Sequence, residues 1–307
     1  MTKLKWLMVA LLATLTTLFT SVFAWLQVSN INILEDLSLE VGVGDTLEIS
    51  LDGINFGKSI DKAMTHELLK NLVFTDITTN DNINFYKGPN LKGKVAERNV
   101  DYIGLDIWFR VALEPGVPEE DVFKEIYLVN HLDITYQDAK SSPSRGTYIT
   151  SEGRMWQADF TFDNGHQIVE KGKIAKYYAK DAMRIGVTSL HNTFIYDTSE
   201  NEERGFGREY GAFEYYNMKT TQKNLELPDV YPETIYQLSR EYPNTGIMDG
   251  TRSLVVILEK AGDYWQGKAT INIWIEGWDA DAFDAILKDH ILIQLEFQAA
   301  WHLDNEG

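Results

Sequence analysis

The chain contains no cysteine among its 307 residues, and basic residues are scarce, with 28 Lys and Arg against 46 Asp and Glu. The lack of cysteine excludes disulfides, thiolate metal sites and a cysteine nucleophile. The formal net charge of −18 argues against nucleic acid and anionic lipid surfaces as partners, because both bind a basic face. With 44% apolar residues, the chain nevertheless has enough hydrophobic surface for a sizeable core.

Familiar catalytic motifs are also missing. His66-Glu67 lacks the second histidine of a zinc protease, since that position is Lys70. The stretch Gly53–Ser59 has three residues between its glycines, whereas a phosphate-binding loop needs four. No Gly-x-Ser-x-Gly nucleophile elbow occurs. We therefore predict that the protein is not an enzyme and binds no organic cofactor.

The N-terminus resembles a secretory leader. Lys3 and Lys5 precede an apolar run, and Val22-Phe23-Ala24 follows it with small or aliphatic residues where a signal peptidase reads. We expect residues 1–24 to be a signal peptide, removed during export by the general secretory route, so that the protein acts outside the cell or at its surface. The alternative is an uncleaved anchor, because a helix over residues 6–25, roughly 30 Å long, just spans a bilayer. Membrane contact is expected through this segment alone.

The rest of the chain is dominated by a period of two. Residues 47–51 and 269–276 alternate between apolar and polar side chains, and residues 103–113 form a denser apolar run. Alternation of this kind is typical of antiparallel sheets with one buried face. Asp163-Asn164-Gly165 predicts a hairpin turn. We predict an all-β fold, an antiparallel, jelly-roll-like β-sandwich, in a single domain over residues 25–307.

A few short helices are expected within the sandwich. Asp61–Leu72 places its apolar residues on one side, and Asp281–Leu287 is long enough for two turns. Pro118 followed by three acidic residues is typical of a helix start. Residues 198–250 are rich in charge, tyrosine and turn residues, which predicts a loop-rich insertion and not a second domain.

One acidic cluster is a candidate metal site. Glu276, Asp279, Asp281 and Asp284 follow a strong strand pattern and would supply oxygen ligands for Ca²⁺, which takes six to eight. Their spacing is not that of an EF-hand. The alternative, which we favour, is that Asp279 or Asp281 caps the short helix and Asp284 faces water.

Aromatic residues suggest a second kind of site. The chain has eight Trp and 15 Tyr, and an exported β-protein can use such rings to stack on sugars. The candidates for a sugar-binding platform, all in the loop-rich insertion, are Tyr210, Phe213, Tyr215 and Tyr216. Trp108 and Trp274 lie within apolar strand patterns, which predicts that both are buried.

The segment that cleavage would leave at the new N-terminus, residues 25–34, is too apolar for a solvated tail. It contains β-branched residues and no proline, as strand pairing favours. The candidate assembly residues are Trp25, Leu26, Val28, Ile31 and Ile33. The segment either pairs within its own sandwich, which gives a monomer, or adds to the open sheet edge of a neighbour. Head-to-tail addition does not close and makes filaments.

Several stretches resemble one group of proteins. Ala24–Asn30, at the end of the leader, with Asp45–Gly53 after it, looks like the start of the TasA/camelysin-type biofilm-matrix proteins exported by Firmicutes and mollicutes. Ala182–Val187 and Ile273–Phe297 are similar to the same group. The resemblance implies a jelly-roll-like sandwich, export, and a matrix-fibre or surface-layer role in which the N-terminal strand of one subunit completes the sheet of the next.

Together these observations predict a secreted or cell-surface structural protein whose partner is another copy of itself. The alternative is an extracellular carbohydrate-binding module, with cell-wall or matrix polysaccharide as its partner.

Overall fold

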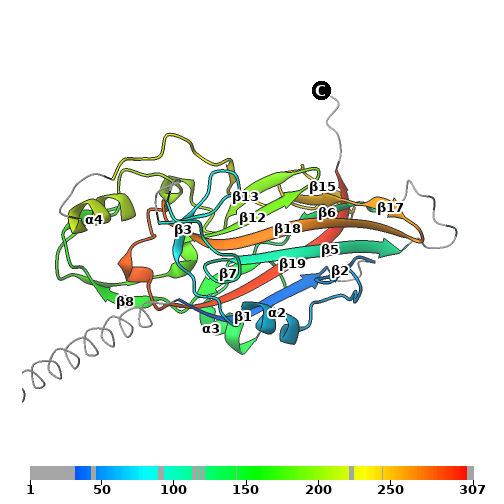
Figure 1. Cartoon of the computed structure of the whole chain (residues 1–307), viewed down its shortest axis with the longest axis horizontal. Helices are drawn as coiled ribbons and strands as arrows, with labels where there is room; N and C mark the ends of the chain where they lie inside the picture. Colours follow the sequence, from blue (N-terminus) through cyan, green and yellow to red (C-terminus); the bar gives the residue numbers. More distant parts are fainter. Residues whose placement is uncertain are drawn as a thin grey trace, which may run out of the picture.

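The computed structural model describes residues 32–42, 46–88, 93–112, 116, 118, 122–142, 144–220, 225–243 and 245–302. Within them, two large β-sheets run along the long axis of the molecule and enclose a common core, with short helices at their margins (Figure 1). The predicted all-β, sandwich-like fold is confirmed. The predicted signal peptide and most of the helix expected after Pro118 lie outside the described residues.

The larger sheet is built around β18 (Tyr264–Glu276). This strand pairs antiparallel with β5 (Ile103–Ala112) and with β12 (Met183–Ser189). The alternation predicted near the end of β18 is confirmed, because Ile271, Ile273 and Ile275 face the main core, and Asn272 and Trp274 between them face the other way. The other strands of this sheet are β2 (Glu48–Ser50), β3 (Asp76–Thr78), β4 (Tyr86–Lys87), β13 (Thr193–Asp197), β14 (Thr234–Ile235) and β17 (Glu259–Ala261).

The smaller sheet is centred on β19 (His290–His302). β1 (Ile33–Val41) lies at its edge and pairs with β19, which also pairs with β6 (Glu125–Leu128). The remaining strands are β7 (Tyr148–Ser151), β15 (Ile247–Met248) and β16 (Leu254–Ile257).

The sequence predicted an antiparallel sandwich, but some of the strand pairs are parallel. β1 and β15 both run parallel to β19, β3 runs parallel to β18, and β14 runs parallel to β13. β1 is the first strand of the described chain and β19 the last, so no hairpin joins them and nothing forces them to run in opposite directions. Local alternation predicts a strand but not the direction of a partner so distant in sequence.

The main core contains aliphatic and aromatic side chains from both sheets. Phe109 of β5 meets Phe297 of β19 edge to face, with ring centroids 5.1 Å apart, and burying one such side chain contributes about 1.5–3 kcal/mol. Trp274 is fully buried, as predicted, but on the outer face of the larger sheet, where it packs against Phe85. Trp108 is only half-buried, contrary to the prediction. Its side chain lies on the face of β5 that points away from the main core, as that of Trp274 does on β18.

The predicted helix after Asp61 is confirmed as α2 (Lys62–Leu69), and the Asp61 side chain accepts a hydrogen bond from the Ala63 backbone N–H, as an N-cap does. Two further α-helices and three 3₁₀ turns complete the described elements. They are α3 (Tyr136–Ser141), α4 (Ala212–Lys219), η2 (Ala179–Ala182), η3 (Glu202–Arg204) and η4 (Asp284–Ile286).

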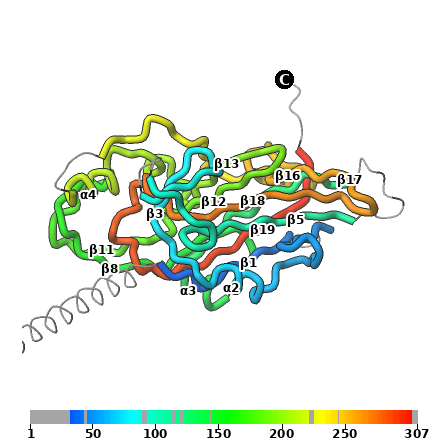
Figure 2. Tube along the Cα trace, in the orientation of Figure 1, coloured from blue at the N-terminus to red at the C-terminus, as the bar shows by residue number. Residues whose placement is uncertain are grey.

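Two small sheets lie at one end of the sandwich, beside α4 and the segment after β18 (Figure 2). They pair β8 (Arg154–Gln157) with β11 (Ile174–Tyr177), and β9 (Phe162–Asp163) with β10 (Ile168–Val169). The β9–β10 pair is the hairpin predicted from Asp163-Asn164-Gly165.

The stretch 198–250 carries η3, α4, β14 and β15 between longer loops. It packs on the sandwich, because Tyr215 and Leu238 belong to the main core. Its strands β14 and β15 extend the edges of the two large sheets.

Candidate functional site

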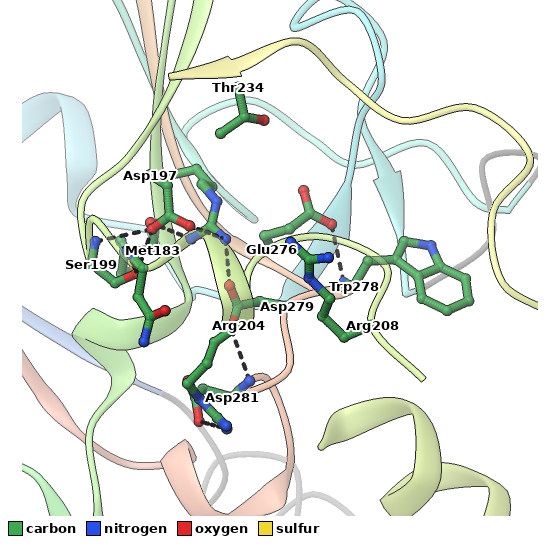
Figure 3. A network of polar contacts seen from close by, with 12 residues as sticks. Met183, Asp197, Ser199, Arg204, Arg208, Thr234, Glu276, Trp278, Asp279 and Asp281 are labelled. Atoms are coloured by element: carbon green, nitrogen blue, oxygen red, sulfur yellow. Dashed lines mark hydrogen bonds and ion pairs between the residues drawn. The ribbon is translucent and has the colours of Figure 1, made fainter. Parts of the chain in front are cut away.

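The carboxylates predicted as metal ligands lie in the segment that ends and follows β18. Figure 3 shows three of them, Glu276, Asp279 and Asp281. Arg184 of β12 is 2% exposed. Its Nη2 lies 2.8 Å from Asp197 Oδ2 and also donates a hydrogen bond to Asp279. The antiparallel register of β12 and β13 places Arg184 directly opposite Asp197. Burial disfavours the charge on Arg184, but the two carboxylates offset this effect and raise the pKa of the guanidinium.

The other carboxylates have separate partners. Glu276 accepts hydrogen bonds from Trp274 Nε1 at 2.9 Å and from the Trp278 backbone N–H at 3.1 Å. Asp281 accepts two hydrogen bonds from Arg204 of η3, at 2.7 Å from Nε and 2.5 Å from Nη2. Each carboxylate is therefore already neutralised or hydrogen-bonded by the chain itself.

Asp284 is held by α4. Lys219 pairs with its carboxylate, and the hydroxyls of Tyr215 and Tyr216 donate to it at 3.1 and 3.3 Å. The four predicted ligands thus do not converge on a Ca²⁺ site, and within the described residues no group of three or more His, Cys, Asp or Glu side chains could hold a metal ion. The capping alternative is wrong too, because η4 has no side-chain cap.

The network joins the 198–250 insertion to the sandwich. Arg204 and Lys219 come from the insertion, and Asp281 and Asp284 come from the segment after β18. Burial raises the pKa of Glu276 to about 7, so this carboxyl titrates near neutral pH. The pairs Arg204–Asp281 and Lys219–Asp284 fix the insertion in place.

The four aromatic residues predicted as a sugar platform face different neighbours. Tyr215 is fully buried in the main core, and Tyr216 packs against it. Phe213 stacks on Trp278, with ring centroids 6.4 Å apart, and Tyr210 is half-buried beside the β9–β10 hairpin. The four rings do not form a shared exposed surface, because α4 turns Tyr215 into the core and Phe213 towards Trp278, and Tyr210 precedes the helix.

Only one of the predicted assembly residues falls within the described chain. Ile33 opens β1, is 45% exposed, and donates its backbone N–H to Asp289 O at 2.8 Å. The described part of the segment therefore pairs within its own sheet. The other assembly residues, namely Trp25, Leu26, Val28 and Ile31, lie outside the described residues.

The outer edge of β1 is covered over only part of its length. Near its end, Val41 N–H donates to Lys58 O at 2.9 Å, and Leu39 O accepts from Ile60 N–H at 3.1 Å. Nearer its start, β1 borders a groove of about 490 Å³ whose opposite wall is α2. The helix side chains that line this groove include Ala63 and Leu69.

A second hollow, of about 410 Å³, is polar and lies where the loop after β6, the turn after β13 and residues 237–241 meet β19. The buried Tyr196 contacts two of its lining residues, because its Oη lies 2.7 Å from His131 Nδ1 and donates to Glu200 Oε1 at 2.9 Å. Sequence reasoning missed this cluster, since His131 and Tyr196 are 65 positions apart and no motif connects them.

Within the parts of the chain that the structure describes, no helix is long and apolar enough to cross a membrane. Comparison of the chain with protein-family models, with curated proteins and with solved structures gives no match. The resemblance to TasA/camelysin-type proteins therefore stays a prediction.

Proposed function

We propose that the protein is an exported structural subunit that associates with copies of itself by strand addition at the outer edge of β1. The observation that carries this proposal is the groove between β1 and α2, which borders a stretch of strand edge. Unpaired strand edges are templates for pairing with another chain. The role is one of assembly and not of catalysis.

Backbone geometry supports addition at this edge. Leu39 and Val41 direct their backbone groups outward, and alternation along the strand directs those of Leu37 the same way. A register shift between Leu34 and Asp36 then turns the N–H of Leu34 outward as well. The groove thus offers both backbone hydrogen bonds and apolar side chains to an extended segment.

The occupant that we propose is residues 25–31 of a neighbouring copy. This segment is apolar and contains β-branched residues without proline. It leads directly into Asn32, which lines the groove, so each copy carries the donor segment next to its own acceptor. Such a heterologous contact repeats from copy to copy and builds a filament.

The test uses the chain from residue 25 to 307, examined by electron microscopy and by light scattering after gel filtration. Ala63→Trp fills the groove from the exposed surface of α2, and it should abolish filaments without lowering the melting temperature. Glu67→Trp adds the same bulk to α2 at a position that does not line the groove, and it should leave filaments intact. A chain from 25 to 307 that stays monomeric at high concentration would refute the proposal.

A further inference from the structure

We propose that the polar hollow beside His131 binds one sugar residue, whose hydroxyl groups donate hydrogen bonds to His131, Glu200 and Gln298. This inference is independent of strand addition, because the hollow and the β1–α2 groove are lined by different residues.

The proton on His131 is placed by its neighbours. Tyr196 carries one hydroxyl proton, and burial together with nearby Glu200 raises the pKa of Tyr196, which keeps that proton in place. The hydroxyl gives it to Glu200, so its oxygen can only accept from His131 Nδ1. In the neutral ring this places the His131 proton at Nδ1 and leaves a lone pair on Nε2. Among the described residues, no hydrogen bond reaches this Nε2 atom.

The amide of Gln298 is oriented in a similar way. Its Nε2 donates to Glu241 Oε2 at 2.8 Å, and Glu241 Oε1 accepts from the Gly246 backbone N–H at 2.7 Å. Gln298 Oε1 is left as an acceptor, as is the second carboxylate oxygen of Glu200. The wall thus presents three acceptors of different types, and a hydrogen bond with a neighbouring side chain orients each of them.

Acceptors of this kind match a ligand that is rich in hydroxyl donors. The floor of the hollow includes Val129 and Leu238, both buried and apolar, which suits the C–H face of a pyranose ring. Charges of both signs line it, among them Arg240 and Glu200, so a neutral ligand fits better than an ion. The volume of about 410 Å³ is in the range of small-molecule sites and suits one ring better than a longer chain.

The first measurement is made on the wild-type protein and needs no variant. The ¹⁵N shifts of the imidazoles should identify His131 as the Nδ1–H tautomer. Titration with glucose, galactose and N-acetylglucosamine should shift the His131 signals for at least one sugar, with a dissociation constant on the order of 1 mM. An Nε2–H tautomer, or no response to any of the three sugars, would overturn the proposal.

Variants then separate direct contact from general effects. Glu200→Gln and His131→Phe should each weaken sugar binding at least about tenfold, as the loss of one well-placed hydrogen bond to a charged or oriented group does. His166→Phe removes an exposed histidine outside the hollow and should leave binding unchanged. If ethylamine binds and the neutral sugars do not, the hollow recognises a cation and the proposal is wrong.

Discussion

Removal of the Asp279 carboxylate should strongly destabilise the protein. Asp279 is 1% exposed and Arg184 is 2% exposed, so in Asp279→Ala the guanidinium loses one of its two ion pairs, keeps the one with Asp197, and cannot reach water. Breaking a buried pair on one side costs about 3–5 kcal/mol. For a chain of this length, an unfolding entropy of about 2.1 cal/mol/K per residue converts that loss into a fall in melting temperature of roughly 5–8 °C. Urea denaturation and calorimetry measure both quantities.

The comparison variants make this argument quantitative. Asp281→Ala breaks the bidentate pair with Arg204, whose side chain is 10% exposed, and should cost less than Asp279→Ala. Asp284→Ala affects Lys219, which is 42% exposed, and the lost ion pair should contribute about 0–1 kcal/mol. Equal losses in all three variants would show that burial does not set the cost. A rise in melting temperature on adding Ca²⁺, absent from Asp279→Ala, would show that the carboxylates bind a cation after all.

Two other substitutions follow from single observations. Burial raises the pKa of Glu276 from 4.5 to about 7, so its contribution to stability is present below about pH 4.5 and is lost as the pH rises to 7. Glu276→Gln should flatten this fall, as measured by urea denaturation across that range. Gly211 has a φ of +66°, and an added Cβ would lie 2.1 Å from the Ala280 carbonyl oxygen, so Gly211→Ala should cost several times more than Gly262→Ala. Gly262 shares the φ of +66° but has no atom within 4 Å, and thermal unfolding should show a loss of only about 1 kcal/mol there.

Strand faces, turns and helix caps could be predicted from the sequence, because residues close together in the chain determine them. The alternation near the end of β18 identifies which face of the strand is buried. Asp163-Asn164-Gly165 marks a turn that the flanking residues close as a hairpin. Asp61 caps α2 because its side chain reaches a backbone N–H two residues ahead. Each of these depends on neighbours in the sequence.

The candidate metal site could not be judged from the sequence, because the deciding partner is distant. The acidic run at the end of β18 looks like a cation site until Arg184, 95 positions away from Asp279, supplies the charge. Nothing near Asp279 in sequence indicates that arginine. Trp108 and Trp274 have similar flanking residues, yet only Trp274 lies under a second layer of side chains. Burial on the outer face of a sheet is decided by which loop crosses it.

The buried network and the polar hollow are connected through one turn. Asp197 receives Arg184 on one oxygen, and its other oxygen accepts from the Ser199 backbone N–H at 3.0 Å and hydroxyl at 2.7 Å. Its carbonyl then accepts from Glu200 N–H at 3.1 Å, and Glu200 holds a φ of 52°, a left-handed conformation that costs about 1–2 kcal/mol outside glycine. Because the Arg184 pair fixes Asp197, it also holds Glu200 against Tyr196. The Asp279→Ala protein keeps the Arg184–Asp197 pair, so below its lowered melting temperature it should bind sugar as tightly as the intact protein. Weaker binding would show that Arg184 needs both carboxylates to hold this turn in place.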